Sequence, residues 1–159
     1  MLLFRQTSAR QINISLALLR VILGLTFVIH GGQKLFVMGF TGVSGMFGHI
    51  GIPMPGLLGP FVALVEFFGG IAIVLGLLTR LAALGLAGDM LVAILTVHLK
   101  AGFFNPNGFE FPLALFAIAV SLAVTGAGAL SVDALIGKRI PERPDTSIGR
   151  GLDQQRKAA

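Results

Sequence analysis

Long apolar stretches, separated by short polar connections, dominate the pattern along this chain. Four of them are nearly free of charge, at residues 15–36, 57–78, 81–99 and 111–130. A helix rises about 1.5 Å per residue, so about 20 apolar residues cross a hydrocarbon layer of about 30 Å. The pattern therefore predicts an all-α fold, a bundle of four transmembrane helices.

The composition supports a lipid environment. Hydrophobic residues make up 55% of the 159 residues and charged residues only 12%, against about 25% charged in soluble domains. We expect one membrane domain at residues 15–137, an amino tail at 1–14, and a basic, disordered tail at 138–159. The first stretch resembles a signal peptide, but it is too long and lacks a small-x-small cleavage site, so we expect a retained anchor.

The distribution of Lys and Arg predicts the orientation. Short connections rich in these residues stay cytoplasmic. The cations expected on that side are Arg5, Arg10, Arg80 and those of residues 138–159. The opposite connections hold only Lys34 and Lys100, which can reach outward from span ends. Both termini are therefore predicted to be cytoplasmic, in a multi-pass protein of the bacterial plasma (inner) membrane.

Two short helices are predicted outside the spans. The glycine-rich connection 37–56 keeps apolar side chains three and four residues apart, at Phe40, Val43, Phe47 and Ile50. This spacing indicates either a short amphipathic helix on the membrane surface or, equally, an irregular loop. After the fourth span, Ser131 and Asp133 are candidate caps for a short helix at residues 134–137.

Several classes of function are excluded or disfavoured. The net charge of +5 lies in tails and span ends without a basic face, so nucleic acid is not an expected partner and the lipid bilayer is. The chain has no cysteine, which excludes thiolate catalysis and cysteine-held iron–sulfur centres. The glycines of the spans indicate close helix packing. None of them forms a strand–loop–helix phosphate cradle, so the sequence does not support nucleotide binding.

Arg20 and Asp89 are charged residues inside predicted spans. A charge at bilayer depth costs about 2.5–3.5 kcal/mol on insertion scales, so it needs a partner or a role. Counted from the predicted cytoplasmic ends of their spans, the two lie at similar depth. We therefore predict a structural intramembrane pair that joins the first and third helices.

A second group of titratable residues falls in the outer half: His30, Lys34, Glu66, His98, Lys100 and Glu110. Together they predict a pocket that binds a small lipophilic molecule through a carbonyl group, with a quinone as the candidate ligand. The alternative is that each cation reaches the interface separately and that Glu66 hydrogen-bonds to a neighbouring helix. The residues alone favour neither interpretation.

Haem and metal ions are less favoured cofactors. His30 and His98 on facing helices have the geometry of axial haem ligands, but a histidine at a span end is more often interfacial. A metal site formed by His30, Glu66 and His98 is disfavoured because neither the ligand number nor the supporting contacts can be read from the sequence. We expect no metal, and the cofactor stays open.

The collected residues resemble the DoxX family of small bacterial membrane proteins over residues 15–137. The resemblance is carried by these motifs: Arg20-x3-Gly24-x2-Phe27-x2-His30-Gly31-x2-Lys34, Glu66-x2-Gly69-Gly70, Leu75-Gly76-Leu77-Leu78-Thr79-Arg80, His98-x3-Gly102-Phe103-Phe104, Asn107-Gly108-Phe109-Glu110-Phe111-Pro112 and Gly126-x-Gly128-x2-Ser131-x-Asp133. It implies a four-span bundle and a link to redox physiology. Relatives include the small subunit of a thiosulfate:quinone oxidoreductase and a partner of a sulfurtransferase and a superoxide dismutase.

Three hypotheses about function follow. The first is a component of a quinone- or sulfur-linked redox system with the outer-half pocket as its binding site. The second is a non-catalytic scaffold that anchors soluble oxidoreductase or sulfurtransferase partners through its basic tail. The third is a small transporter or permeability factor, disfavoured by the absence of an inverted repeat. The sequence leaves catalysis, substrate, electron donor and oligomeric state open.

Overall fold

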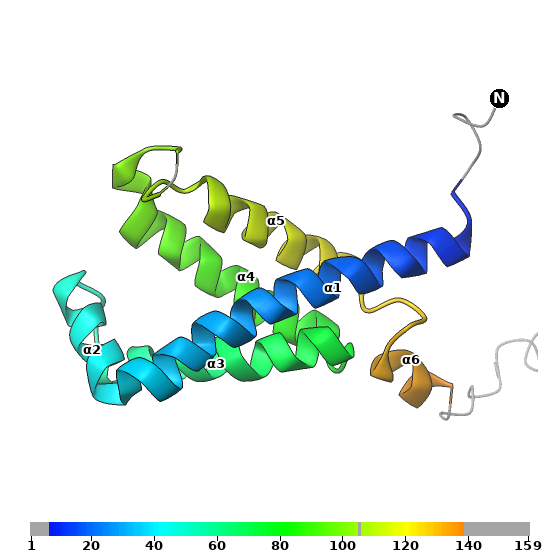
Figure 1. The fold of residues 1–159 in the computed structure, drawn as a ribbon, viewed down its shortest axis with the longest axis horizontal. Coiled ribbons are helices and arrows are strands. Elements are labelled where there is room, and N and C mark those ends of the chain that lie inside the picture. The colour runs from blue at the N-terminus through cyan, green and yellow to red at the C-terminus, as the bar shows by residue number, and fades with distance from the viewer. Residues whose placement is uncertain (1–6, 105, 139–159) are drawn as a thin grey trace, which may run out of the picture.

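The computed structural model describes residues 7–104 and 106–138, and in these residues it consists of helices without strands (Figure 1). The α-helices are α1 Ala9–Gly32, α2 Gly39–His49, α3 Pro55–Leu75, α4 Thr79–Ala93, α5 Glu110–Thr125 and α6 Val132–Gly137. Two π-helical segments, η2 Gln33–Met38 and η3 Ile94–His98, and a short 3₁₀ turn, η4 Leu99–Ala101, extend α1 and α4. The predicted all-helical class is confirmed for this part of the chain.

Three helical segments are long and apolar enough to cross a membrane: Ala9–His49, Pro55–Leu75 and Thr79–Ala101. The fourth apolar helix, α5, has 16 residues and spans about 24 Å. It ends at Thr125, five residues before the predicted end, because Gly126 adopts φ +79 and breaks the helix. The helical membrane bundle is thus confirmed, and a complete fourth crossing by α5 stays a prediction.

The start of α1 lies six residues before the predicted span. Ser8 and Gln11 form a capping box in which the Ser8 hydroxyl accepts a hydrogen bond from the Gln11 N–H and the Ser8 N–H donates to Gln11 Oε1. The first turns of α1 extend past the other long helices in Figure 1. As a result, residues of α1 lie closer to the end of the bundle than a count from residue 15 suggests.

The long helices pack as two close pairs, α1 with α3 and α4 with α5. Glycines bring α1 and α3 together: a Cβ on Gly24 would lie 2.6 Å from the carbonyl oxygen of Gly70. Around this contact Leu23, Phe27 and Ile73 are almost fully buried and form a core with residues of α4 and α5. The core fixes the two pairs relative to each other.

The connection between the first two spans contains the helix α2, so the helical alternative is confirmed over the irregular loop. Val43 and Phe47 are buried, whereas Phe40 is 51% exposed. The helix packs on the start of α3, where a Cβ on Gly59 would lie 3.1 Å from the Ser44 nitrogen. That α2 lies on the membrane surface stays a prediction.

The start of α1, the turn between α3 and α4, and α6 gather at one end of the bundle, which we call the α6 end; the opposite end is the α2 end (Figure 1). At the α6 end the Ala129 N–H donates to Asn13 Oδ1 over 2.8 Å, which joins the last connection to α1. The two ends of the described chain therefore lie on one side. That this side is cytoplasmic stays a prediction.

The outward surface of the helices is apolar. Ile29, Leu81 and Val124 are between 68% and 72% exposed, on three different helices. Monomeric soluble proteins rarely expose apolar patches larger than a few hundred Å². The exposed apolar side chains are suited to contact with lipid acyl chains.

Candidate functional site

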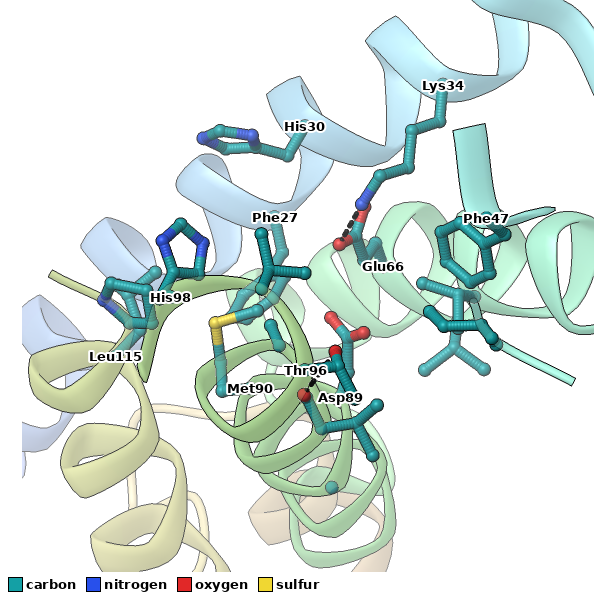
Figure 2. A pocket seen from close by; sticks show the side chains of 18 of the residues that line it. Phe27, His30, Lys34, Phe47, Glu66, Asp89, Met90, Thr96, His98 and Leu115 are labelled. Atoms are coloured by element: carbon teal, nitrogen blue, oxygen red, sulfur yellow. Dashed lines mark hydrogen bonds and ion pairs between the residues drawn. The ribbon is translucent and has the colours of Figure 1, made fainter. Parts of the chain in front are cut away.

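A cavity of about 780 Å³ lies toward the α2 end, between the α1–α3 pair and the α4–α5 pair (Figure 2). Apolar side chains from all five of the helices α1 to α5 line most of its wall. Its titratable lining residues are His30, Lys34, Glu66, Asp89 and His98. The volume falls within the range of about 300–1,000 Å³ that small-molecule pockets occupy.

Lys34 and Glu66 form an ion pair at the centre of the polar side of the cavity. The Lys34 ammonium donates to Glu66 Oε1, and Figure 2 shows the lysine reaching across from η2 to α3. Glu66 is only 2% exposed. The pair depends on close packing one turn before Lys34, because Gly31 approaches the backbone of Phe67, the residue after Glu66. The structure thus brings together two of the predicted site residues.

Asp89 also faces this cavity, from α4. Figure 2 shows its side chain directed toward Glu66, and Asp89 interacts electrostatically with both Glu66 and Lys34. Among the residues that the structure describes, Glu66 Oε2 and Asp89 Oδ2 are buried without a hydrogen-bond partner. The cavity therefore has two carboxyl groups and one lysine on its polar side.

His30 and His98 lie on a different side of the cavity from the carboxyl groups. His30 is exposed on α1, one turn before Lys34. The Nδ1 atom of His98 is 2.9 Å from the carbonyl oxygen of Asn107, so this nitrogen carries the proton and donates. Within the described ranges, His30, Glu66 and His98 do not converge as a set of metal ligands.

The other two predicted pocket residues lie outside the cavity lining. Lys100 is exposed in the 3₁₀ turn η4, and Glu110 begins α5. Neither is among the residues that line the cavity. Counting along the sequence placed them correctly near the α2 end but could not show which way their side chains turn.

The predicted pair of Arg20 and Asp89 is wrong. Arg20 is 3% exposed at the α6 end, where its guanidinium donates to the carbonyl oxygen of Leu130. Asp89 lies ten residues after the first residue of α4, Thr79, which is about 15 Å along the helix. The error arose because the first turns of α1 extend past the other long helices (Figure 1), so Arg20 lies at the end of the bundle although it is eleven residues into α1, whereas Asp89 lies well inside it.

Around Arg20, hydrogen bonds join α1, the start of α4 and residues 130–133 at the α6 end. Ser131 caps α6 by accepting from the Ala134 N–H at 3.1 Å, as predicted. Asp133 does something else: its carboxylate accepts the N–H groups of Leu78 at 2.8 Å and Thr79 at 3.0 Å, and so caps α4. Burial raises the pKa of Asp133, but these hydrogen bonds and the charge of Arg20 outweigh it, so the pKa is lowered overall.

Two residues at the site were not predicted there: Thr96 was missed, and Asp89 was assigned to a pair with Arg20. Both line the cavity, seven residues apart on one face of α4 and its π-helical extension. That spacing was a usable signal, since residues two turns apart share a helix face. The π-helical segments that carry Lys34 and Thr96 had no recognisable signal, although such segments are frequent at functional sites.

Comparisons with known proteins point to one family. The DoxX family model matches residues 15–99. The putative oxidoreductase CatD of Bacillus subtilis is 36% identical over 129 residues, covering 81% of this chain and 92% of the relative. The inner membrane protein YqjF of Escherichia coli is 33% identical, covering 80% and 95%. The uncharacterized membrane protein Rv3486 of Mycobacterium tuberculosis is 33% identical, covering 79% and 83%. No solved structure matches the chain.

Proposed function

The chain belongs to the DoxX family of membrane proteins and resides in the inner membrane, and from this premise we propose that it binds a small lipophilic molecule as a component of a redox system. The observation that carries the proposal is the cavity of about 780 Å³ with Lys34, Glu66 and Asp89 on one side. A quinone is the candidate ligand. With the predicted orientation, the cavity opens in the outer half of the membrane.

The composition of the cavity wall supports this class of ligand. Most lining residues are apolar, such as Phe27, Met90 and Leu115, and they suit a hydrocarbon or ring system. The charged groups are confined to a small region and include the Lys34 ammonium, a strong donor for a carbonyl oxygen. Apolar walls with a few convergent polar groups are the usual design of a small-molecule site.

The redox part of the proposal rests on one relative. CatD is named a putative oxidoreductase, and it is similar to this chain over nearly its whole length. A lysine and two carboxyl groups around a lipophilic headgroup are also the groups that proton-coupled carbonyl chemistry requires. The cavity supports the binding of a ligand, and the name of CatD supports the class of reaction.

A fluorescent reporter tests binding directly. The chain has neither Trp nor Tyr, so a single introduced tryptophan is observed without background. Phe61 lines the cavity and is 58% exposed, whereas Phe68, two turns further along α3, is 59% exposed but outside the lining. We expect decylubiquinone to quench Phe61→Trp saturably in lipid nanodiscs and to quench Phe68→Trp only weakly. Equal, non-saturating quenching of both would refute binding in the cavity.

Filling the cavity provides an independent test with a matched control. Gly88 lines the cavity, and a Cβ there meets nothing within 4 Å, so Gly88→Leu adds bulk without a backbone clash. Gly45 on α2 is equally open but lies outside the lining. In the Phe61→Trp background, Gly88→Leu should weaken decylubiquinone binding by about ten-fold or more, or about 1.4 kcal/mol. Gly45→Leu should leave it unchanged, and equal effects of the two variants would count against the site.

Redox coupling needs a separate measurement. Membranes that contain the Glu66→Gln variant should show a lower rate of quinone-linked electron transfer than membranes with the unaltered protein, because Lys34 loses the partner that positions it. The amount of protein in the membrane is the control. An unchanged rate and unchanged quinone affinity would contradict the pocket as a redox site.

A further inference from the structure

We propose that Glu66 and Asp89 share a single proton, so that the polar side of the cavity is electrically neutral and selects neutral ligands that accept hydrogen bonds. The observation behind this is the meeting of two carboxyl groups and one lysine in an apolar cavity, with an oxygen of each carboxyl buried and unpartnered among the residues described. Nothing in the family match assigns a role to Asp89.

The charge balance of Lys34, Glu66 and Asp89 indicates that the two carboxyl groups hold one proton. Lys34 neutralises one carboxylate through its ion pair with Glu66. A second carboxylate beside the first would then be an uncompensated negative charge next to a like charge. Burying such a charge costs more than protonating it, and two carboxyl groups that cannot both ionise hold one proton between them. One proton on the Glu66–Asp89 pair therefore makes the three groups neutral together.

Among the described residues, no other charged group that faces the cavity replaces this proton. Of the elements that line it, α1 contributes His30 and η3 contributes His98, and both lie away from the carboxyl groups in Figure 2. The cavity residues of α2 and α5 are apolar, among them Phe47 and Leu115. A histidine cation at that distance would act on both carboxyl groups only weakly compared with Lys34, which is bonded to one of them.

The shared proton determines which charge of ligand the cavity prefers, and this part of the inference rests on the proposed function. The shared proton lies between the two carboxyl groups, so the donors left for a ligand are the remaining N–H bonds of the Lys34 ammonium. A ligand with an uncharged carbonyl group can accept from these donors without adding net charge. A fatty-acid anion or an alkylammonium cation would bring an unbalanced charge into the apolar site. The cavity should therefore prefer neutral carbonyl compounds of the same chain length.

Infrared spectroscopy of the ligand-free, full-length protein in nanodiscs tests the proton. At neutral pH we expect a C=O stretching band of a protonated carboxyl group. Asp89→Asn and Glu66→Gln should each abolish it, because either variant leaves one carboxylate to pair with Lys34. Lys34→Met should increase its intensity about two-fold, since both carboxyl groups must then be protonated. Far-UV circular dichroism of each variant establishes that it is folded.

Two results would overturn the shared proton. One is the absence of the band in the unaltered protein, which would show that a bound cation or a second charge balances the site. The other is persistence of the band in folded Glu66→Gln, which would show that Asp89 is protonated regardless of its neighbour. Because no ligand is present, these outcomes do not depend on whether decylubiquinone binds.

Competition in the Phe61→Trp protein tests the ligand class. Dodecyl methyl ketone should displace decylubiquinone, whereas dodecanoate and dodecylammonium should need concentrations about ten-fold higher or more. Equal potency of the three compounds would refute selection by charge while leaving the binding site itself intact. Failure of decylubiquinone to bind would instead refute the proposed function and leave the infrared result standing.

Discussion

Replacing Gly31 by alanine should separate α1 from α3 beside the candidate site. A Cβ on Gly31 would lie 2.4 Å from the backbone nitrogen of Phe67 and 2.8 Å from its Cα, where ordinary contacts begin near 3.4 Å. Both atoms belong to the backbone of a neighbouring helix, so neither can rotate away. The two helices must therefore move apart by about 1 Å next to Glu66 and Lys34.

The magnitude follows from two opposing effects. Overpacking of a close helix contact costs about 1–3 kcal/mol. The gain in helix propensity from glycine to alanine returns up to about 1 kcal/mol. Gly32 provides the matched control, because a Cβ there lies 3.7 Å from the ring of Phe67, which is ordinary contact. Gly32→Ala keeps the propensity gain without the clash, so the two variants should differ by about 1–3 kcal/mol.

Unfolding by sodium dodecyl sulfate in mixed micelles, followed by far-UV circular dichroism, measures this difference in the free energy of unfolding. Gly31→Ala should unfold at the lower detergent fraction and should also bind decylubiquinone more weakly in the Phe61→Trp background. The second effect is expected because the clash displaces Lys34 relative to Glu66. Equal stability of the two alanine variants would show that the helices do not approach as closely as the structure indicates, and the reasoning would fail.

Two further predictions concern the α6 end. Asp133→Ala should lower the free energy of unfolding by about 1 kcal/mol at neutral pH, since it removes the cap on Leu78 and Thr79. The pKa of Asp133 is lowered in the folded state, so its stabilising contribution is present above the unfolded pKa of about 3.9 and is lost as the pH falls through the folded pKa. The difference in thermal stability between Asp133→Ala and the unaltered protein should therefore become smaller in acid. A difference that does not depend on pH would contradict the capping role. Gly76→Ala should lower the free energy of unfolding more, by about 2 kcal/mol or more, because φ at this position is +69 and the new Cβ would lie 1.7 Å from Arg20 Nη1. A folded variant with unchanged thermal stability would contradict the close packing of Gly76 against Arg20.

The sequence predicted those features that depend on local pattern. The three long apolar helices were found because apolar runs of that length have few alternatives, and the short helix α6 was found because Ser131 is a strong cap. Of the six residues predicted to meet in one pocket, His30, Lys34, Glu66 and His98 line one cavity, whereas Lys100 and Glu110 lie outside its lining. Their binding role stays a prediction.

The features that were missed depend on register between helices. Asp89 was assigned to Arg20 because both were counted from the apparent ends of apolar runs, and hydropathy does not show where a capping box extends a helix into solvent. Asp133 was assigned to its own helix because a cap is read locally, whereas the carboxylate in fact bonds to the start of α4. Contacts of this kind are set by the fold and leave no trace in spacing.

The charged groups at the two ends of the bundle have different surroundings, and this difference indicates which end binds a ligand. At the α6 end the Arg20 guanidinium bonds to the carbonyl oxygen of Leu130, and the Asp133 carboxylate accepts two backbone N–H groups. These bonds join segments that are far apart in sequence. Among the described residues, Glu66 and Asp89 each have one buried carboxyl oxygen without a hydrogen-bond partner, as Arg20 has Nε and Nη1, but Glu66 and Asp89 line the cavity and Arg20 does not. Ionisable groups at bilayer depth are costly, so the retention of Lys34, Glu66 and Asp89 beside a cavity is explained better by an incoming hydrogen-bonding ligand than by stability.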